Sequence, residues 1–182
     1  MHDDVKKVLI TKEEIDKMVK KLAATISRDY EGRQLVLIGV MKGCLIFLAD
    51  LLRNITIPVE FGTITASSYG SGTESSGQIK IINDVDIEIK GKDIIVIEDL
   101  VDTGLTLNYL KNFLGLREPK SVKICVAFDK PSRRKNPIDI DYKGMDIPDE
   151  FIVGYGLDFN EKYRNLPEIC VLKEEIYNEG VS

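Results

Sequence analysis

Hydrophobic and polar residues form two patterns along the chain. Apolar runs at 35–40 and 94–97, too short for a typical helix and too apolar for a half-exposed strand, predict parallel strands buried on both faces. Residues 122–128 predict a third apolar strand. Apolar residues at helical spacing predict helices over 45–53 and from about Leu107 onward. A longer helix is predicted from Thr11 to about Arg28, because Thr11 and Glu14 have the spacing of a capping box. Strands that alternate with helices indicate βαβ units and a right-handed parallel sheet.

Two further strands are expected at 59–66 and 78–82, on either side of a stretch rich in glycine and serine. Residues 67–77 include three glycines and five serines, a composition that cannot pack a core. This stretch is expected to be mobile, either as the tip of a hairpin or as a lid over an active site. The part of the chain after Asp129 is rich in proline and loops, but no linker divides the sequence. A single domain over 1–182 is therefore predicted.

Composition and charge narrow the possible functions. With 43% hydrophobic and 30% charged residues, the 182-residue chain is not disordered and has enough apolar material for a core. A net charge of −5 argues against general binding of nucleic-acid backbones, but it allows a local basic site for one phosphorylated small molecule. The one histidine, His2, lies near a terminus, which removes Ser-His-Asp and Cys-His catalysis and most zinc chemistry.

Cysteine usage and the lack of long apolar runs predict a cytoplasmic protein. Cys44, Cys125 and Cys170 are far apart and have apolar neighbours, so they are expected to be buried free thiols in a reducing compartment. No run of 18 apolar residues is present and the first residues are polar. Neither a membrane span nor a secretory signal is therefore expected.

The segment after the apolar run 94–97 carries the candidate chemistry. Ligands bind beyond the carboxyl ends of parallel strands, where Glu98, Asp99 and Asp102 stand just before a predicted helix. Three carboxylates in five residues repel one another unless they meet hydroxyl donors, a cation or a proton to be removed. Residues 103–106 offer backbone amides, two hydroxyls and a glycine, which favours a phosphate cradle over an ordinary N-cap. Because the Walker sequence and the dinucleotide fingerprint are both absent, the pattern predicts a ribose 5-phosphate ligand.

The segment from 96 to 107 resembles the phosphoribosyl-diphosphate signature of the type I phosphoribosyltransferases. Three further segments resemble one branch of that family, the hypoxanthine (hypoxanthine-guanine) phosphoribosyltransferases, and stand in the family's order: 39–43, 67–70 and 153–164. The resemblance implies an α/β fold of the type I phosphoribosyltransferase kind, with a central, mainly parallel sheet flanked by helices. It also implies a small hood formed by N- and C-terminal segments, the latter over about 129–182, and a mobile hairpin lid over about 67–78.

For function, the resemblance implies purine salvage by a Mg²⁺-dependent enzyme. The 5-phosphoribosyl group would pass from phosphoribosyl diphosphate to N9 of hypoxanthine or guanine, giving IMP or GMP and diphosphate. These small molecules are the expected partners, without nucleic acid or membrane, and the chain is expected to form a homodimer or homotetramer. A xanthine- or uracil-preferring transferase and a nucleic-acid-binding regulator on the same fold remain alternatives. The presence of Asp102 and the net charge of −5 favour an enzyme.

The matched motifs assign a role to each candidate residue. Asp102 would be the general acid/base near N7 of the purine, and Glu98 and Asp99 would hold the ribose hydroxyls and Mg²⁺. The 5-phosphate is assigned to Asp102, Thr103, Gly104, Leu105 and Thr106. The diphosphate is assigned to Met41, Lys42, Gly43 and Arg164, with a cis peptide bond between the first two.

The purine is assigned to Lys130, Phe151, Ile152 and Asp158. Lys130 would donate to O6 and thereby discriminate against adenine, whose amino group is a donor at that position. Phe151 would stack on the base, and the backbone of Ile152 would bind the ring edge. Asp158 would ligate a second Mg²⁺.

A few other positions complete the comparison with the family. Ser68 and Tyr69 would close the lid over the diphosphate and exclude water. Leu105 replaces a lysine found in some relatives, and Phe159 stands where tyrosine is frequent. The basic cluster 133–135 has no assigned role, and a solvated loop or a subunit contact is expected there.

Overall fold

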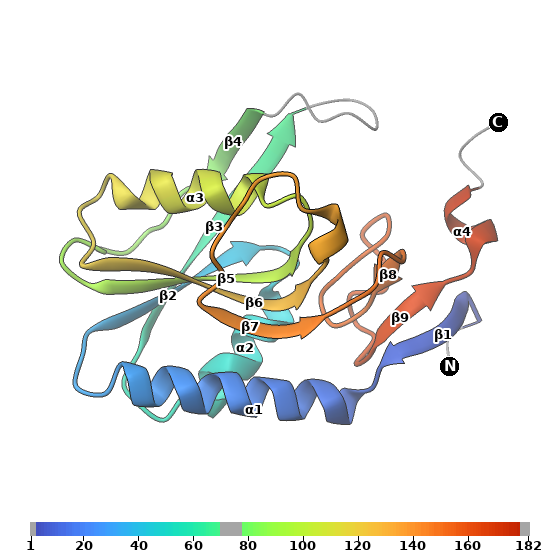
Figure 1. The fold of residues 1–182 in the computed structure, drawn as a ribbon, viewed down its shortest axis with the longest axis horizontal. Coiled ribbons are helices and arrows are strands. Elements are labelled where there is room, and N and C mark those ends of the chain that lie inside the picture. Colours follow the sequence, from blue (N-terminus) through green and yellow to red (C-terminus); the bar gives the residue numbers. More distant parts are fainter. Residues whose placement is uncertain (1–2, 70–77, 179–182) are drawn as a thin grey trace.

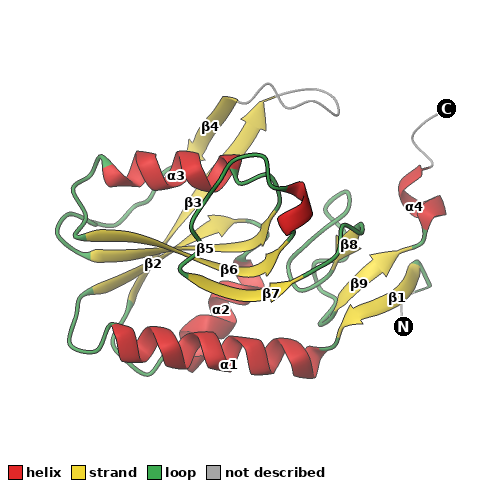
Figure 2. Ribbon diagram, viewed as in Figure 1, coloured by secondary structure: helices red, strands yellow, loops and turns green. Residues whose placement is uncertain are grey.

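The computed structural model describes residues 3–69 and 78–178, which form two β-sheets with helices packed on them (Figures 1 and 2). The helices are α1 (Lys12–Asp29), α2 (Leu45–Asn54), α3 (Leu105–Gly115) and α4 (Glu174–Asn178), with a short 3-10 helix at Pro131–Arg133. The strands are β1 (Val5–Ile10), β2 (Leu35–Met41), β3 (Glu60–Tyr69), β4 (Gln78–Asn83), β5 (Asp93–Val101), β6 (Ser121–Asp129), β7 (Tyr142–Asp146), β8 (Ile152–Val153) and β9 (Ile169–Leu172).

The large sheet has the strand order β4-β3-β2-β5-β6-β7. Every neighbouring pair is parallel except β3 and β4, which form an antiparallel hairpin. The central strands β2, β5 and β6 correspond to the three predicted apolar strands. The expected mainly parallel sheet is therefore confirmed.

Helices cover both faces of this sheet, which explains why its central strands are mainly apolar. Leu35 and Leu37 of β2 belong to a buried cluster with residues of α1 and α2, whereas Val36 and Ile38 belong to a second cluster with residues of α3. Figure 1 shows α1 and α2 on one side of the sheet and α3 on the other. The amphipathic helix α1 begins at the predicted capping box, in which Glu14 N donates to the Thr11 hydroxyl.

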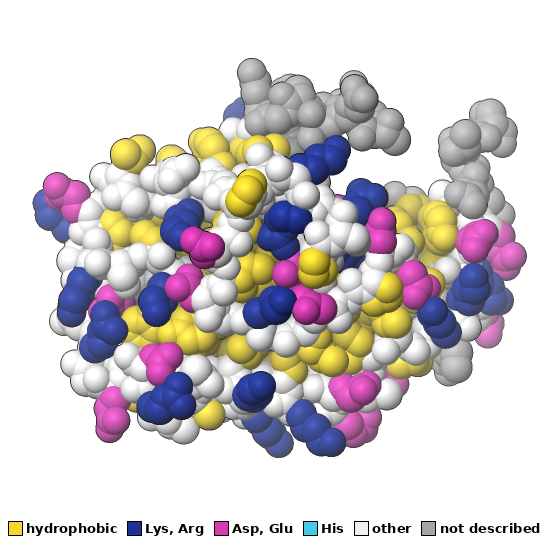
Figure 3. All heavy atoms as spheres, viewed as in Figure 1, with side chains coloured by type: hydrophobic (Ala, Val, Ile, Leu, Met, Phe, Trp, Pro, Cys, Tyr) yellow, Lys and Arg dark blue, Asp and Glu magenta, His cyan; other side chains and the backbone are white. Residues whose placement is uncertain are grey.

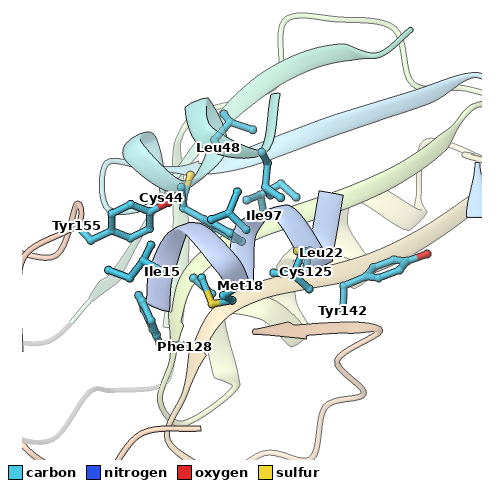
Figure 4. Close-up of a cluster of buried hydrophobic side chains, with 14 of the residues drawn as sticks. Ile15, Met18, Leu22, Cys44, Leu48, Ile97, Cys125, Phe128, Tyr142 and Tyr155 are labelled. Atoms are coloured by element: carbon cyan, nitrogen blue, oxygen red, sulfur yellow. The ribbon is translucent and has the colours of Figure 1, made fainter. Parts of the chain in front are cut away.

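The first cluster also contains two of the cysteines. Met18 and Leu22 of α1, Leu48 of α2 and Cys125 of β6 pack within it (Figure 4). Cys44, Cys125 and Cys170 are all buried free thiols, as expected. Among the described residues, no helix is long and apolar enough to cross a membrane.

The small sheet joins the two ends of the chain. Its order is β1-β9-β8 and all its pairs are antiparallel, so the N-terminal strand lies beside the last one (Figure 1). This sheet corresponds to the expected hood. The hood was expected to include all residues from about 129 to 182, but β7, which lies in this range, pairs with β6 in the large sheet instead.

The predicted loop over 67–77 is shorter than expected at its N-terminal end. Strand β3 continues to Tyr69 because β4 pairs with its last residues, Ser67 opposite Lys80 and Tyr69 opposite Gln78. Ser68 and Tyr69 therefore belong to a strand, and this part of the loop prediction was wrong. The lid was predicted over about 67–78, and its remaining part, residues 70–77 and the side chains of Ser68 and Tyr69, lies outside the described part of the structure.

Candidate active site

Loops from three parallel strands meet at one edge of the large sheet. The loop after β6 is bonded to the loop after β5, because Asn136 N donates to Thr103 O (2.9 Å). The loop after β2 lies against the end of β5, where a Cβ on Gly43 would overlap Oδ2 of Asp99 and lie 2.7 Å from its Cγ. The candidate residues of these separate segments therefore form one site, at the sheet edge where α/β proteins bind ligands.

Glu98 and Asp99 form a buried acidic pair in the last part of β5. They are 9% and 8% exposed, and neither makes an ion pair with a lysine or arginine among the described residues. Burial, followed by the charge of Asp99, raises the pKa of Glu98 well above its usual range. Two buried carboxylates without a basic partner can bind a cation or donating hydroxyl groups.

The expected phosphate cradle lies between β5 and the start of α3. A cavity of about 160 Å³ is lined by residues of this turn and by Glu98: Glu98, Leu100, Val101, Asp102, Thr103, Gly104, Thr106 and Leu107. Gly104 has φ 82°, and a Cβ there would lie 2.6 Å from Asn136 O, so this turn requires glycine. The first amides of the 11-residue helix α3 follow directly, which suits a phosphate.

Lys42 and Arg164, the two cations assigned to the diphosphate, bind the same carboxylate. Lys42 Nζ donates to both carboxylate oxygens of Glu161 (3.2 Å each), and Arg164 Nη2 donates to Glu161 Oε2 (3.2 Å). These contacts lower the pKa of Glu161. Arg164 Nε is buried without a hydrogen-bond partner among the described residues. The two cations, 122 positions apart, thus lie where one anion can contact both.

The segment that holds Arg164 is tightly constrained. Gly156 N donates to Arg164 O (3.0 Å), and Arg164 Nη1 donates to Gly156 O (2.8 Å). Asn160, Glu161 and Tyr163 all have positive φ, a conformation that costs energy and is concentrated at functional sites. The peptide bond between Met41 and Lys42 is cis, as the resemblance implies.

Three of the four residues assigned to the purine also lie together. Lys130 is 8% exposed, and its Nζ donates to Glu150 O (2.7 Å), directly before Phe151. The Phe151 ring is 39% exposed and stacks on Tyr177 of α4, with centroids 4.8 Å apart. Ile152 begins β8 and is buried. An ammonium group is thus fixed beside an accessible aromatic ring.

Asp102 and Asp158 are already paired with arginines. Asp102, which is half-exposed, accepts a hydrogen bond from Arg133 Nε (3.0 Å). Asp158 Oδ1 forms an ion pair with Arg164 Nη2 (2.9 Å). Within the described ranges no group of three or more His, Cys, Asp or Glu side chains could hold a metal. The predicted metal ligands Glu98, Asp99 and Asp158 therefore do not form one carboxylate cluster.

Three residues that contact the site received no role from the sequence. Arg133 was noticed only as part of a basic cluster, and Glu161 only as part of a matched segment. Tyr177 gave no signal, because a tyrosine near the end of a chain is unremarkable until its ring is found on Phe151.

Comparisons with known proteins show the family to which the chain belongs. The family model for the phosphoribosyl transferase domain matches residues 9–160. The chain is 50% identical over 179 residues to the hypoxanthine-guanine phosphoribosyltransferase of Streptococcus agalactiae, covering 98% of this chain and 99% of that protein. It is 49% identical over 177 residues to that of Bacillus subtilis, covering 97% and 98%. The bifunctional TilS/HprT protein of Listeria monocytogenes is 46% identical over 179 residues, which are 98% of this chain but only 28% of that protein's length.

Solved structures share the fold along nearly the whole chain. A hypoxanthine phosphoribosyltransferase from Staphylococcus aureus has a TM-score of 0.93 and 45% identity, covering 97% of this chain and 96% of that chain. A hypoxanthine-guanine phosphoribosyltransferase from Bacillus anthracis has a TM-score of 0.89 and 48% identity, covering 93% and 99%. With this agreement in sequence and fold, the chain belongs to the hypoxanthine-guanine phosphoribosyltransferases, a branch of the type I phosphoribosyltransferase family.

Proposed function

We propose that this protein transfers the 5-phosphoribosyl group of phosphoribosyl diphosphate to N9 of hypoxanthine and guanine. The observation that carries the proposal is the contact between Gly43 and Asp99. It joins the loop with Lys42 to the acidic end of β5, which continues into the phosphate cradle of α3. One ligand with a phosphate at one end, a sugar in the middle and a diphosphate at the other end fits this order of groups.

In the proposed reaction the bond between C1 of the ribose and the diphosphate oxygen breaks, and its electron pair leaves with diphosphate. N9 of the purine then forms the new bond to C1, and the proton on N7 passes to the carboxylate of Asp102. Positive charge develops on the ribose as diphosphate departs. The buried carboxylates Glu98 and Asp99 would stabilise it, since fixed charges act strongly in a site that excludes water.

The donor set of this chain fits Mg²⁺. Mg²⁺ binds oxygen ligands and takes one or two carboxylates together with substrate phosphates and water. Glu98 and Asp99 supply two buried carboxylates without a basic partner among the described residues, and Asp158 supplies a third that is now bound to Arg164. When bound, the ion would neutralise charge on the leaving diphosphate.

Lys130 and Phe151 would select the base. An ammonium group held by Glu150 O can donate to the O6 of hypoxanthine or guanine, whereas adenine has an amino group at that position. Stacking on Phe151 does not distinguish among purines. Discrimination between hypoxanthine, guanine and xanthine depends on contacts at C2, so xanthine use is an outcome that the assay must measure.

A steady-state panel tests the proposal. The protein is given Mg²⁺, phosphoribosyl diphosphate and one of adenine, guanine, hypoxanthine or xanthine, and nucleotide formation is followed by absorbance. Hypoxanthine and guanine should react, and adenine should be slower by about 10⁴-fold. Faster reaction with xanthine would revise the substrate, and no reaction with any purine would refute the function.

The proposal also covers the organisation of the protein. We expect residues 1–182 to act as a single domain, with residues around Ser68 and Tyr69 as a lid, in a cytoplasmic assembly of two or four chains. Sedimentation equilibrium measures the assembly directly. On the face shown in Figure 3, basic and acidic side chains are interspersed, so a basic surface for nucleic acid does not gather there.

A further inference from the structure

The basic cluster 133–135 divides into residues with different surroundings. Arg134 is largely buried and pairs with the buried Asp129, so it supports the end of β6. Lys135 is exposed. Arg133 instead faces the candidate active site, where it pairs with Asp102 and Asp149. The residue types alone do not distinguish these three roles.

Arg133 belongs to a chain of alternating charges. Its Nε donates to Asp102 Oδ1 (3.0 Å), and its Nη1 lies 3.6 Å from Asp149 Oδ2. The other oxygen of Asp149 lies 3.9 Å from Lys130 Nζ. A series of contacts from Asp102 through Arg133 and Asp149 to Lys130 therefore connects the proposed acid/base to the proposed donor for O6.

The backbone holds this chain of charges in place. Lys130 N donates to Val101 O (3.0 Å), and Lys135 N donates to Thr103 O (3.2 Å). The segment with Arg133 is thus bonded at both ends to the residues that flank Asp102. Arg133 N also donates to Lys130 O (3.1 Å), which closes the short helical turn between them.

The positions of N7 and O6 on the purine explain why Asp102 and Lys130 would need to be connected. N7 and O6 lie on the same edge of the base, so the groups that bind them must keep a fixed separation. Arg133 binds Oδ1 of Asp102, and no described residue donates to Oδ2. One oxygen is therefore anchored and the other is available to N7.

We propose that Arg133 is a positioning residue that sets the direction of the Asp102 carboxylate relative to Lys130. The inference rests on the proposed function, because it concerns how the same site handles the purine. Arg133, Asp102 and Asp149 have side chains that are 51%, 42% and 49% exposed, and such ion pairs contribute little to folding stability. The effect of Arg133 therefore belongs to the reaction rather than to the fold.

Arginine suits this role better than lysine. Its planar guanidinium presents several donors in fixed directions and can bind Asp102 and Asp149 at once, whereas a lysine ammonium is a point charge on a flexible stem. Arg133→Lys should retain part of the function that Arg133→Gln loses. Lys135→Gln removes one positive charge from the same loop and keeps the backbone N–H, so it is the matched control.

The test measures single-turnover rates of IMP formation with enzyme in excess over hypoxanthine, together with calorimetric binding of phosphoribosyl diphosphate. Arg133→Gln should lower the single-turnover rate about tenfold, since small misplacements of reacting groups have large effects. Arg133→Lys should be intermediate and Lys135→Gln unchanged. Binding of phosphoribosyl diphosphate should stay within about twofold in all three variants.

A double-mutant cycle with Asp102→Asn separates positioning from a general structural effect. If Arg133 acts through the Asp102 carboxylate, Arg133→Gln should have no further effect once that charge is gone. An equal loss in both backgrounds, or a wild-type rate for Arg133→Gln, would overturn the inference while the proposed function stands. A wild-type protein that forms no nucleotide from any purine would instead refute the proposed function itself.

Discussion

Replacing Gly43 with alanine tests the close approach between the loop after β2 and the acidic end of β5. A Cβ at this position would overlap Oδ2 of Asp99 and lie 2.7 Å from its Cγ, whereas ordinary contacts are 3.4–4 Å. Asp99 cannot move away freely, since it is 8% exposed and its Oδ1 accepts a hydrogen bond from Leu100 N (2.8 Å). Overpacking of this kind costs about 1–3 kcal/mol. For a domain of this size, that cost lowers the melting temperature by about 2–12 °C.

The loss of activity should be larger than the loss of stability suggests. Gly43 and Asp99 both belong to the proposed site, and a displacement of about 1 Å among reacting groups can lower a rate about 100-fold. Thermal unfolding and IMP formation at 25 °C measure the two effects separately. Gly115→Ala is the matched control, because nothing lies within 4 Å of the new Cβ. It should keep full activity and gain about 0.5–1 kcal/mol of stability. A wild-type melting temperature and turnover for Gly43→Ala would refute the reasoning.

Other substitutions probe the acid, the aromatic ring and the buried carboxylate. Asp102→Asn should lower turnover about 100-fold or more with little change in calorimetric binding of phosphoribosyl diphosphate; equal losses in both would contradict its role. Tyr177→Ala should raise the KM for hypoxanthine roughly 2- to 10-fold, because the Tyr177 ring stacks on Phe151; an unchanged KM would show that this support is dispensable. Glu98→Gln should raise the melting temperature in Mg²⁺-free buffer, more at pH 8 than at pH 5. Burial raises the pKa of Glu98, so its contribution to the stability of the wild-type protein is intact below the ordinary glutamate pKa and is lost as the pH rises. A gain in melting temperature that did not depend on pH would contradict this.

The central part of the fold was predictable because its signals are local. Strands β2, β5 and β6 are covered by helices on both faces, so their apolar runs stand out in the sequence. Helix α1 carries its own start signal in the capping box at Thr11 and Glu14. The carboxylates after 94–97 were also recognisable as candidate chemistry from spacing alone, although Glu98 and Asp99 belong to the strand itself.

Peripheral elements had no comparable signal. Strand β1 carries two lysines between its apolar residues, and β7 contains lysine, glycine and aspartate in five positions. Each becomes a strand because a partner far along the chain, β9 or β6, supplies its hydrogen bonds. The extension of β3 through Ser68 and Tyr69 has the same origin, since β4 pairs with residues whose composition is typical of a loop.

The sequence by itself determined where the buried strands and the helices between them lie along the chain. It also determined which residue types are available for binding a ribose phosphate. Only the tertiary structure decided which distant charges meet: Lys42 on Glu161, and Arg133 on Asp102. Periodicity and capping depend on neighbours within a few residues, and they can be seen in a sequence. An ion pair between residues 31 or more positions apart depends on how the loops pack at the edge of the sheet, which no local pattern encodes.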